Sequence, residues 1–273
     1  MNIRLIIFLF LFAVNVNCQT TQKTIYKTIG SVNLEIEIFQ ATNKIPNQKS
    51  PAIIFFFGGG WNGGTTDQFR PQAEYLASRG MVAILADYRV KTKHQASPFE
   101  SLMDAKSAIR LVRMNASKWN IDPNRIVASG GSAGGHLAAA TALIEAYNDP
   151  QDDTTISCVP NALILFNPVI DNGPGGYAYE RIGAEYKNFS PLHNILPGAP
   201  PTLFMLGTKD ALIPVETGAY YQKVMEIVGS RCELKLYEDA GHGFFNPRNP
   251  EFYKATLNET DLFLQSLGYI EQK

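Results

Sequence analysis

The sequence predicts an α/β fold in which helices cover both faces of one mostly parallel sheet of about eight strands. Three observations support this prediction. Apolar runs of strand length, such as residues 52–57 and 81–86, have no polar interruption, which is typical of strands buried on both faces. Segments of helical periodicity separate these runs, so strands and helices alternate along the chain. A glycine-rich turn at residues 129–136 joins one such strand to one such helix.

The expected strands are of two kinds. The first two alternate apolar and polar residues on either side of a turn that contains Gly30 and Asn33, which indicates a half-exposed hairpin. The later strands are short and apolar, with many β-branched or aromatic residues, which indicates central strands. The strands are expected at residues 24–29, 34–39, 52–57, 81–86, 125–128, 162–166, 202–206 and 233–237.

The helices follow from apolar periodicity and from the residues that end them. Residues 98–114 place Leu102, Ala105 and Ile109 on one face, and the helix at 215–228 stops at Gly229. Residues 171–200 lack clear periodicity, so we expect an irregular insert with one short helix, lying over the site. The helices are expected at residues 69–79, 98–114, 136–144, 215–228 and 250–267.

Composition and charge exclude several classes of protein. The 273 residues have a formal net charge of −1 and no charged block, which argues against nucleic acid or an acidic membrane surface as a partner. No Cys/His spacing indicates a metal site, and we expect no cofactor. An oxidising compartment would permit a disulfide between Cys158 and Cys232, but we expect two separate thiols. No feature of the sequence predicts an oligomeric state.

Residues 1–18 are expected to be a secretory signal. A short positive head precedes an apolar run at residues 5–14, which is too short to span a bilayer. Cleavage after Cys18 would leave a single domain, residues 19–273, that is secreted or periplasmic and has no stable membrane insertion. The alternative is a lipoprotein acylated on Cys18.

The nucleophile is predicted from a turn. Gly130, Ser132 and Gly134 form the pattern G-x-S-x-G between an expected strand and an expected helix. A serine on so sharp a turn has a strained backbone and an exposed hydroxyl, and the helix N-terminus adds free N–H groups beside it. Ser132 is therefore the predicted nucleophile. The alternative is an ordinary capping serine in a glycine-rich turn.

A serine nucleophile requires a base, and the base requires a partner that fixes its tautomer. His242 lies in a glycine-flanked loop directly after the last strand and is the predicted base, with His193 as the alternative. Asp210 follows the preceding strand and is the predicted acid, with Asp171 as the alternative. Such groups lie together beyond the carboxyl ends of parallel strands.

Acyl transfer also requires N–H donors for the oxyanion that forms in the transition state. Three glycines, Gly58–Gly60, follow the first central strand and allow close approach of the backbone to a ligand. The N–H groups of Gly59, Gly60 and Ala133 are predicted to form the oxyanion hole. The alternative is a flexible turn.

These residues resemble the α/β-hydrolase family of esterases and lipases over about residues 51–245. The order Ser132, Asp210, His242 is the family's order. The glycine segment is similar to the HGGG-type oxyanion segment, although Phe57 stands where histidine is usual. The resemblance implies an α/β-hydrolase fold without a large cap domain, and a metal-free serine ester hydrolase.

Three further segments carry the resemblance. Asp87–Arg89 and Asp104–Lys106 resemble segments of the family for which a structural role is implied. Ser190–Leu192 resembles bacterial carbohydrate esterases of the acetylxylan and feruloyl type. With no cap to enclose a long chain, the acyl group is expected to be short, such as acetyl. The insert's aromatic residues are expected to offer flat faces to a sugar ring, or else to be ordinary loop packing: Tyr177, Tyr179, Tyr186 and Phe189.

Other functions remain as alternatives. A generic carboxylesterase or lipase acting on small lipophilic esters needs the same triad. A serine peptidase could use the same fold, and a hydrolase fold could serve only for binding. A dinucleotide-binding oxidoreductase is the remote alternative, because residues 58–63 also fit G-x-G-x-x-G and Asp87 ends the next strand.

Overall fold

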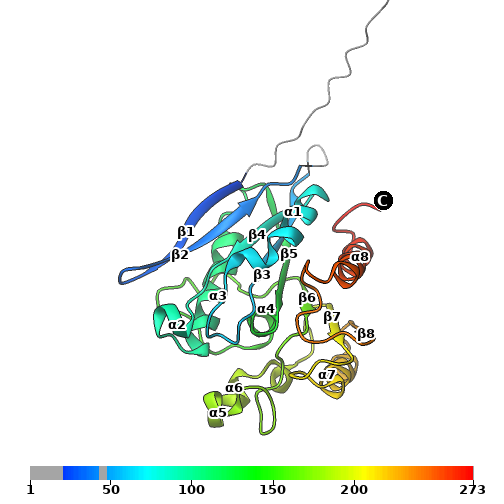
Figure 1. Cartoon of the computed structure of the whole chain (residues 1–273). Helices are drawn as coiled ribbons and strands as arrows, with labels where there is room; N and C mark the ends of the chain where they lie inside the picture. The colour runs from blue at the N-terminus through cyan, green and yellow to red at the C-terminus, as the bar shows by residue number, and fades with distance from the viewer. Residues whose placement is uncertain (1–20, 43–47, 273) are drawn as a thin grey trace, which may run out of the picture.

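The computed structural model describes residues 21–42 and 48–272, which form one eight-stranded sheet with helices on both faces (Figure 1). The strand order is β1-β2-β4-β3-β5-β6-β7-β8. In this sheet β2 alone runs against the other strands, so the predicted α/β-hydrolase architecture is confirmed. The expected signal, including Cys18, lies outside the described residues. No described helix combines the length and apolar character needed to cross a membrane.

Each of the eight expected strands is present. The strands are β1 (Thr21–Ile29), β2 (Val32–Phe39), β3 (Ser50–Phe56), β4 (Val82–Ala86), β5 (Ile121–Gly131), β6 (Ala162–Phe166), β7 (Thr202–Gly207) and β8 (Cys232–Tyr237). The helices are α1 (Arg70–Ser78), α2 (Lys91–His94), α3 (Pro98–Met114), α4 (Ala133–Leu143), α5 (Tyr179–Ile182), α6 (Tyr186–Phe189), α7 (Val215–Ile227) and α8 (Pro250–Ser266).

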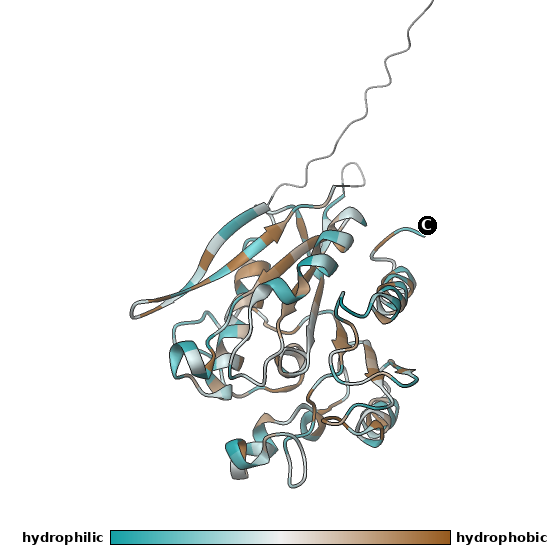
Figure 2. Ribbon diagram, viewed as in Figure 1, coloured by the Kyte–Doolittle hydropathy of each residue, from teal (hydrophilic) through white to brown (hydrophobic). Residues whose placement is uncertain are grey.

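Two apolar layers hold the helices against the sheet. Side chains of α3, α4 and α7 pack on one face, while those of α1 and α8 pack on the other. Strands β4 and β6 are apolar along their whole length, and hydrophilic residues lie on the outer faces of helices such as α1 and α8 (Figure 2). Burial on both faces explains why β3 and β4 have no alternating polar positions.

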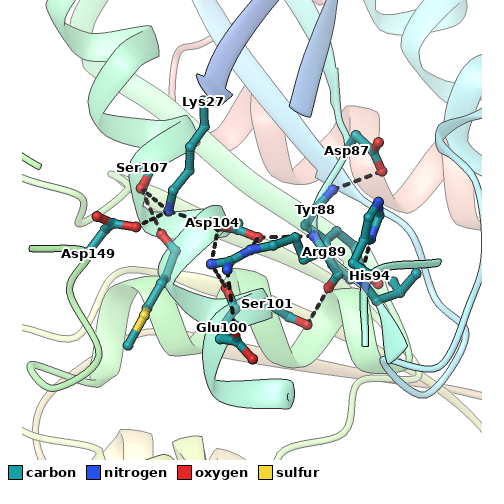
Figure 3. Close-up of polar contacts among 12 residues, drawn as sticks. Lys27, Asp87, Tyr88, Arg89, His94, Glu100, Ser101, Asp104, Ser107 and Asp149 are labelled. Carbon is teal, nitrogen blue, oxygen red and sulfur yellow. Dashed lines mark hydrogen bonds and ion pairs between the residues drawn. The ribbon is translucent and has the colours of Figure 1, made fainter. Parts of the chain in front are cut away.

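A buried ion cluster attaches the hairpin to α3 (Figure 3). Arg89 donates to both carboxylate oxygens of Asp104, through Nε at 2.7 Å and Nη2 at 2.9 Å. Lys27 of β1 approaches the same carboxylate at 2.8 Å. The Asp104 side chain is 0% exposed, so its charge depends on these two cations. The segments around Arg89 and Asp104 therefore have the structural role that was expected of them.

The insert is more helical than expected, and the two described cysteines are not paired with each other. The insert contains two short helices, α5 and α6, rather than one, and short 3-10 turns at residues 183–185 and 191–194. Cys158 and Cys232 are both free and buried, so the expectation of two separate thiols is confirmed.

Candidate active site

The strand-to-helix turn places Ser132 alone between two elements. Strand β5 ends at Gly131 and α4 begins at Ala133, so the whole change of direction occurs at Ser132. Its backbone has φ 54° and ψ −119°, a strained conformation for a residue with a side chain. Such strain is typical of a residue whose hydroxyl must stand clear of the sheet.

The two motif glycines are required by close backbone contacts. A Cβ on Gly130 would lie 2.4 Å from the carbonyl oxygen of Gly134, and a Cβ on Gly134 would lie 2.0 Å from that of Phe56. Neither position has room for a larger residue. The turn can therefore form only with glycine on both sides of Ser132.

Three predicted residues form one hydrogen-bonded chain beyond the ends of β5, β7 and β8. The Ser132 Oγ lies 2.9 Å from Nε2 of His242. The Nδ1 atom of the same ring lies 2.8 Å from Oδ2 and 3.0 Å from Oδ1 of Asp210. Because the carboxylate only accepts, Nδ1 carries the proton, and Nε2 is left to accept the Ser132 hydroxyl proton.

Asp210 is held as a buried anion. Its side chain is 0% exposed, whereas that of His242 is 22% exposed. Burial raises the pKa of Asp210, but the hydrogen bond from His242 and the backbone N–H groups of Leu212 and Ile213 outweigh this effect, and the net pKa is below the ordinary value. The carboxylate is therefore charged wherever the base works.

The glycine loop faces the nucleophile. A Cβ on Gly58 would lie 3.3 Å from the Cβ of Ser132, and the N–H of Gly58 donates to Oε1 of Gln68 at 2.6 Å. Within the described residues the N–H groups of Gly59 and Gly60 have no acceptor. Ala133 opens α4, where a backbone N–H has no partner within the helix. These three N–H groups are thus available as donors, and the loop faces Ser132 rather than a nucleotide site.

Asn167 belongs to the site although the sequence did not single it out. It is fully buried just after β6, its Oδ1 accepts from the N–H of Gly243 at 3.0 Å, and its Nδ2 lies 3.4 Å from Nε2 of His242. Its φ of 35° lies in the left-handed region, which asparagine adopts more readily than most residues. That preference is a weak signal, and no motif surrounds it.

The alternative acid and base lie apart from the triad, near each other. Nδ1 of His193 lies 3.0 Å from Oγ of Ser190 and 3.9 Å from Oδ1 of Asp171, within the insert. His136 lies on α4, and its Nε2 donates to the carbonyl of Phe189 at 3.0 Å rather than to a triad residue. His94 accepts from the N–H of Val90.

A pocket of about 300 Å³ opens over Ser132. Of the four insert aromatics expected to face a sugar, only Tyr177 lines it. Phe189 is buried against His136 and Trp61, so for this residue the ordinary packing alternative is correct. The pocket is lined by Gly58, Gly59, Gly60, Gln68, Ser132, Asn167, Tyr177, Leu212, His242, Gly243, Phe245, Asn246 and Arg248.

Comparison with protein families finds two matches along the chain. Residues 37–172 match the BD-FAE family, and residues 167–268 match the prolyl oligopeptidase family. The first match contains Ser132 and the glycine loop, and the second contains Asp210 and His242. Together they cover the elements that carry the site.

Individual relatives are esterases. Esterase LipC of Mycobacterium tuberculosis is 30% identical to this chain, and the match covers 73% of this chain and 54% of LipC. An acetylxylan esterase of Xylanibacter ruminicola is 27% identical, and the match covers 81% of this chain and 46% of that esterase. The chain thus spans about half the length of these curated relatives.

Solved structures match over almost their whole length. Thermogutta terrifontis esterase 2 phosphorylated by paraoxon has a TM-score of 0.87 and 44% identity, covering 93% of this chain and 96% of that one. The propionate-bound form of the same esterase has a TM-score of 0.86 with the same identity and coverage.

Proposed function

The chain belongs to the α/β-hydrolase family of esterases, and from this premise we propose that it hydrolyses carboxylic esters with Ser132 as nucleophile. The observation that carries the proposal is the hydrogen-bonded chain from Ser132 through His242 to Asp210. Nucleophile, base and anion lie in one line within hydrogen-bonding distance, which the chemistry requires and an ordinary capping serine does not.

Each group has a defined part in the proposed reaction. Ser132 Oγ attacks the ester carbonyl while Nε2 of His242 takes its proton. Asp210 stabilises the imidazolium, and the N–H groups of Gly59, Gly60 and Ala133 bind the oxyanion. The imidazolium then protonates the departing alcohol, leaving an acyl-serine. Water, deprotonated by His242, releases the acid and regenerates the serine.

The test is covalent labelling combined with paired variants. Paraoxon is expected to modify Ser132, located by mass mapping, because a relative is phosphorylated by the same reagent. Ser132→Ala and His242→Ala are expected to lower kcat by several powers of ten, up to about a million-fold. His193→Ala is the control for His242→Ala, and Asp171→Asn is the control for Asp210→Asn. An adduct on a residue other than Ser132 would contradict the proposal. So would a control variant that loses more kcat than the triad variant with which it is paired.

The acyl group is proposed to be short. The pocket is small, and the related esterase has been observed with propionate and with butyrate bound. Each methylene contributes about 0.8 kcal/mol only where the protein can enclose it. We expect kcat/KM for an acetyl ester to exceed that for the octanoyl ester of the same alcohol. The reverse order would favour a lipase-like esterase.

A carbohydrate ester is the proposed substrate, with small lipophilic esters as the alternative. The acetylxylan esterase relative and Tyr177 at the pocket support the first, whereas relatives such as Esterase LipC support the second equally well. Acetate release from acetylated polysaccharide, compared with p-nitrophenyl acetate, separates them. The p-nitroanilide of the same acyl group tests for peptidase-like amide cleavage, which the second family match makes worth measuring.

A further inference from the structure

Arg248 places an unpaired positive charge in the pocket. Its side chain is exposed and lines the pocket together with Gly243 and Asn246. No aspartate or glutamate is among the residues that line this pocket. Within the described residues it is the one arginine that makes no hydrogen bond or ion pair. The others each donate at least one: Arg70, Arg79, Arg89, Arg110, Arg113, Arg125, Arg181 and Arg231.

Arg248 lies in the same loop as His242, between β8 and α8. A Cβ on Gly243 would lie 3.5 Å from Nη2 of Arg248, so the guanidinium lies directly against the residue that follows His242. Asn246 closes this turn, because its Nδ2 donates to the carbonyl of Gly243 at 2.7 Å and its carbonyl accepts from the N–H of Asn249 at 2.9 Å. The guanidinium therefore lies at one side of the pocket.

That side is where the alcohol half of an ester would lie. His242 must protonate the leaving oxygen through Nε2, so the departing alcohol lies within hydrogen-bonding distance of the ring. A guanidinium next to the same loop therefore faces substituents of the alcohol. A planar guanidinium binds a carboxylate through two parallel hydrogen bonds, and a lone cation in a cleft raises the local concentration of anions.

We propose that Arg248 determines specificity by binding a carboxylate on the alcohol half of the ester, as in acylated hydroxy acids or acylated acidic sugars. This inference rests on the proposed esterase function and narrows its substrate class. It assigns Arg248 a role in substrate binding and none in the bond-making steps.

The test compares two acetyl esters of nearly equal reactivity, 4-acetoxyphenylacetate and its neutral amide, 4-acetoxyphenylacetamide. After correction for their rates of hydrolysis by hydroxide, the wild type is expected to favour the anionic ester in kcat/KM by about five-fold, a modest factor because the site is open to solvent. Arg248→Gln should bring this ratio near one, Arg248→Glu should invert it, and Arg248→Lys should retain part of it. Added salt should reduce the wild-type preference.

Lys254→Gln is the matched control. Lys254 is an exposed cation on α8 that does not line the pocket, so its loss changes the net charge equally and should leave the ratio unchanged. A wild-type ratio near one, or an equal ratio in Arg248→Gln and wild type, overturns the inference. Failure of the wild type to hydrolyse either ester would instead overturn the esterase proposal. Thermal unfolding of each variant verifies that it is folded.

Discussion

At the scale of single residues, Asn167 shows how one amide can contact both a base and the loop that carries it. The N–H of Gly243 can only donate, so the atom that it contacts must be Oδ1 of Asn167, and Nδ2 must face His242. The two contacts join Asn167 to the ring of His242 and to the residue that follows it. We therefore expect Asn167 to act as a positioning residue for the base.

Asn167→Asp tests this role. The variant keeps the acceptor for Gly243 but replaces the donor at Nε2 by a carboxylate oxygen, which favours the imidazolium. We expect the acid limb of the kcat/KM profile to move to higher pH by about one unit. A purely structural role would reduce stability and leave that limb where it is. Measuring both the pH profile and the unfolding midpoint distinguishes the two.

The sequence located Ser132 and His242 because glycines on both sides mark their turns. Asn167, Gln68 and Arg248 have no such mark. Asn167 follows β6 and acquires its role from the loop after β8, so it reaches His242 only when two separate strand ends meet. Gln68 and Arg248 lie ten and five residues from the glycines that they contact, Gly58 and Gly243, but no motif marks either contact.

At the scale of elements, His136 joins three segments. It lies on α4, its ring packs edge-on against Trp61 of the glycine loop at 5.0 Å between centroids, and it donates to Phe189 of the insert. Burial lowers its pKa from the ordinary value of 6.5 to about 3. The folded protein thus holds this ring neutral over a range in which the unfolded chain protonates it.

This difference makes stability depend on pH. Between about pH 6.5 and 3 the unfolded state binds one more proton at His136, so the free energy of unfolding rises with pH, by about 1.4 kcal/mol per unit from this group. His136→Phe should lower stability at pH 7, because the hydrogen bond to Phe189 is lost. It should also reduce the rise of the unfolding free energy with pH by about the amount that His136 contributes. Urea unfolding at pH 4 to 7 measures both. An unchanged slope would show that His136 titrates normally.

The cluster around Asp104 carries a second prediction. Asp104→Asn leaves Arg89 and Lys27 without their shared buried anion, and we expect a loss of about 3 kcal/mol in the free energy of unfolding. Glu100→Gln is the control. The Glu100 carboxylate lies 3.1 Å from the same Arg89, but its side chain is 40% exposed. Its replacement is therefore expected to lower the free energy of unfolding by about 1 kcal/mol or less. Denaturant unfolding compares them; equal losses would contradict the role of burial.

Helix α3 was predicted at its observed bounds from its apolar face, and its first turn carries signals that agree with the predicted start. Pro98 occupies the first turn, and Ser97 with Glu100 forms a capping box. Helix α2 was missed, since four residues are too few to show periodicity. For Phe189, the choice between a sugar contact and ordinary packing could not be made from the sequence, for a different reason. Burial of Phe189 depends on His136 and Trp61, which lie far away in the sequence.

At the scale of the whole molecule, the thiols report both folding and processing. Cys158 and Cys232 are buried, and burial raises the pKa of Cys232 to about 12, so neither should react with Ellman's reagent in the folded protein. In guanidinium, protein recovered outside the cytoplasm should show two reactive thiols if the expected signal ending at Cys18 has been removed. Three would indicate that Cys18 is retained, and rapid reaction before unfolding would contradict the buried positions.

The order of the strands leaves β1 and β8 as the two edges of an open sheet. An edge strand with free backbone groups is a template for pairing with another chain, which leads to aggregation. On β8, Glu233 and Lys235 carry charge along the edge, and on β1 the register shifts between Ile25 and Lys27. A second copy of the chain that paired with β8 would have to bury the charges of Glu233 and Lys235. One that paired with β1 would have to match its shifted register. Charges on one edge and an irregular register on the other are both features that disfavour pairing with the edge of a second copy.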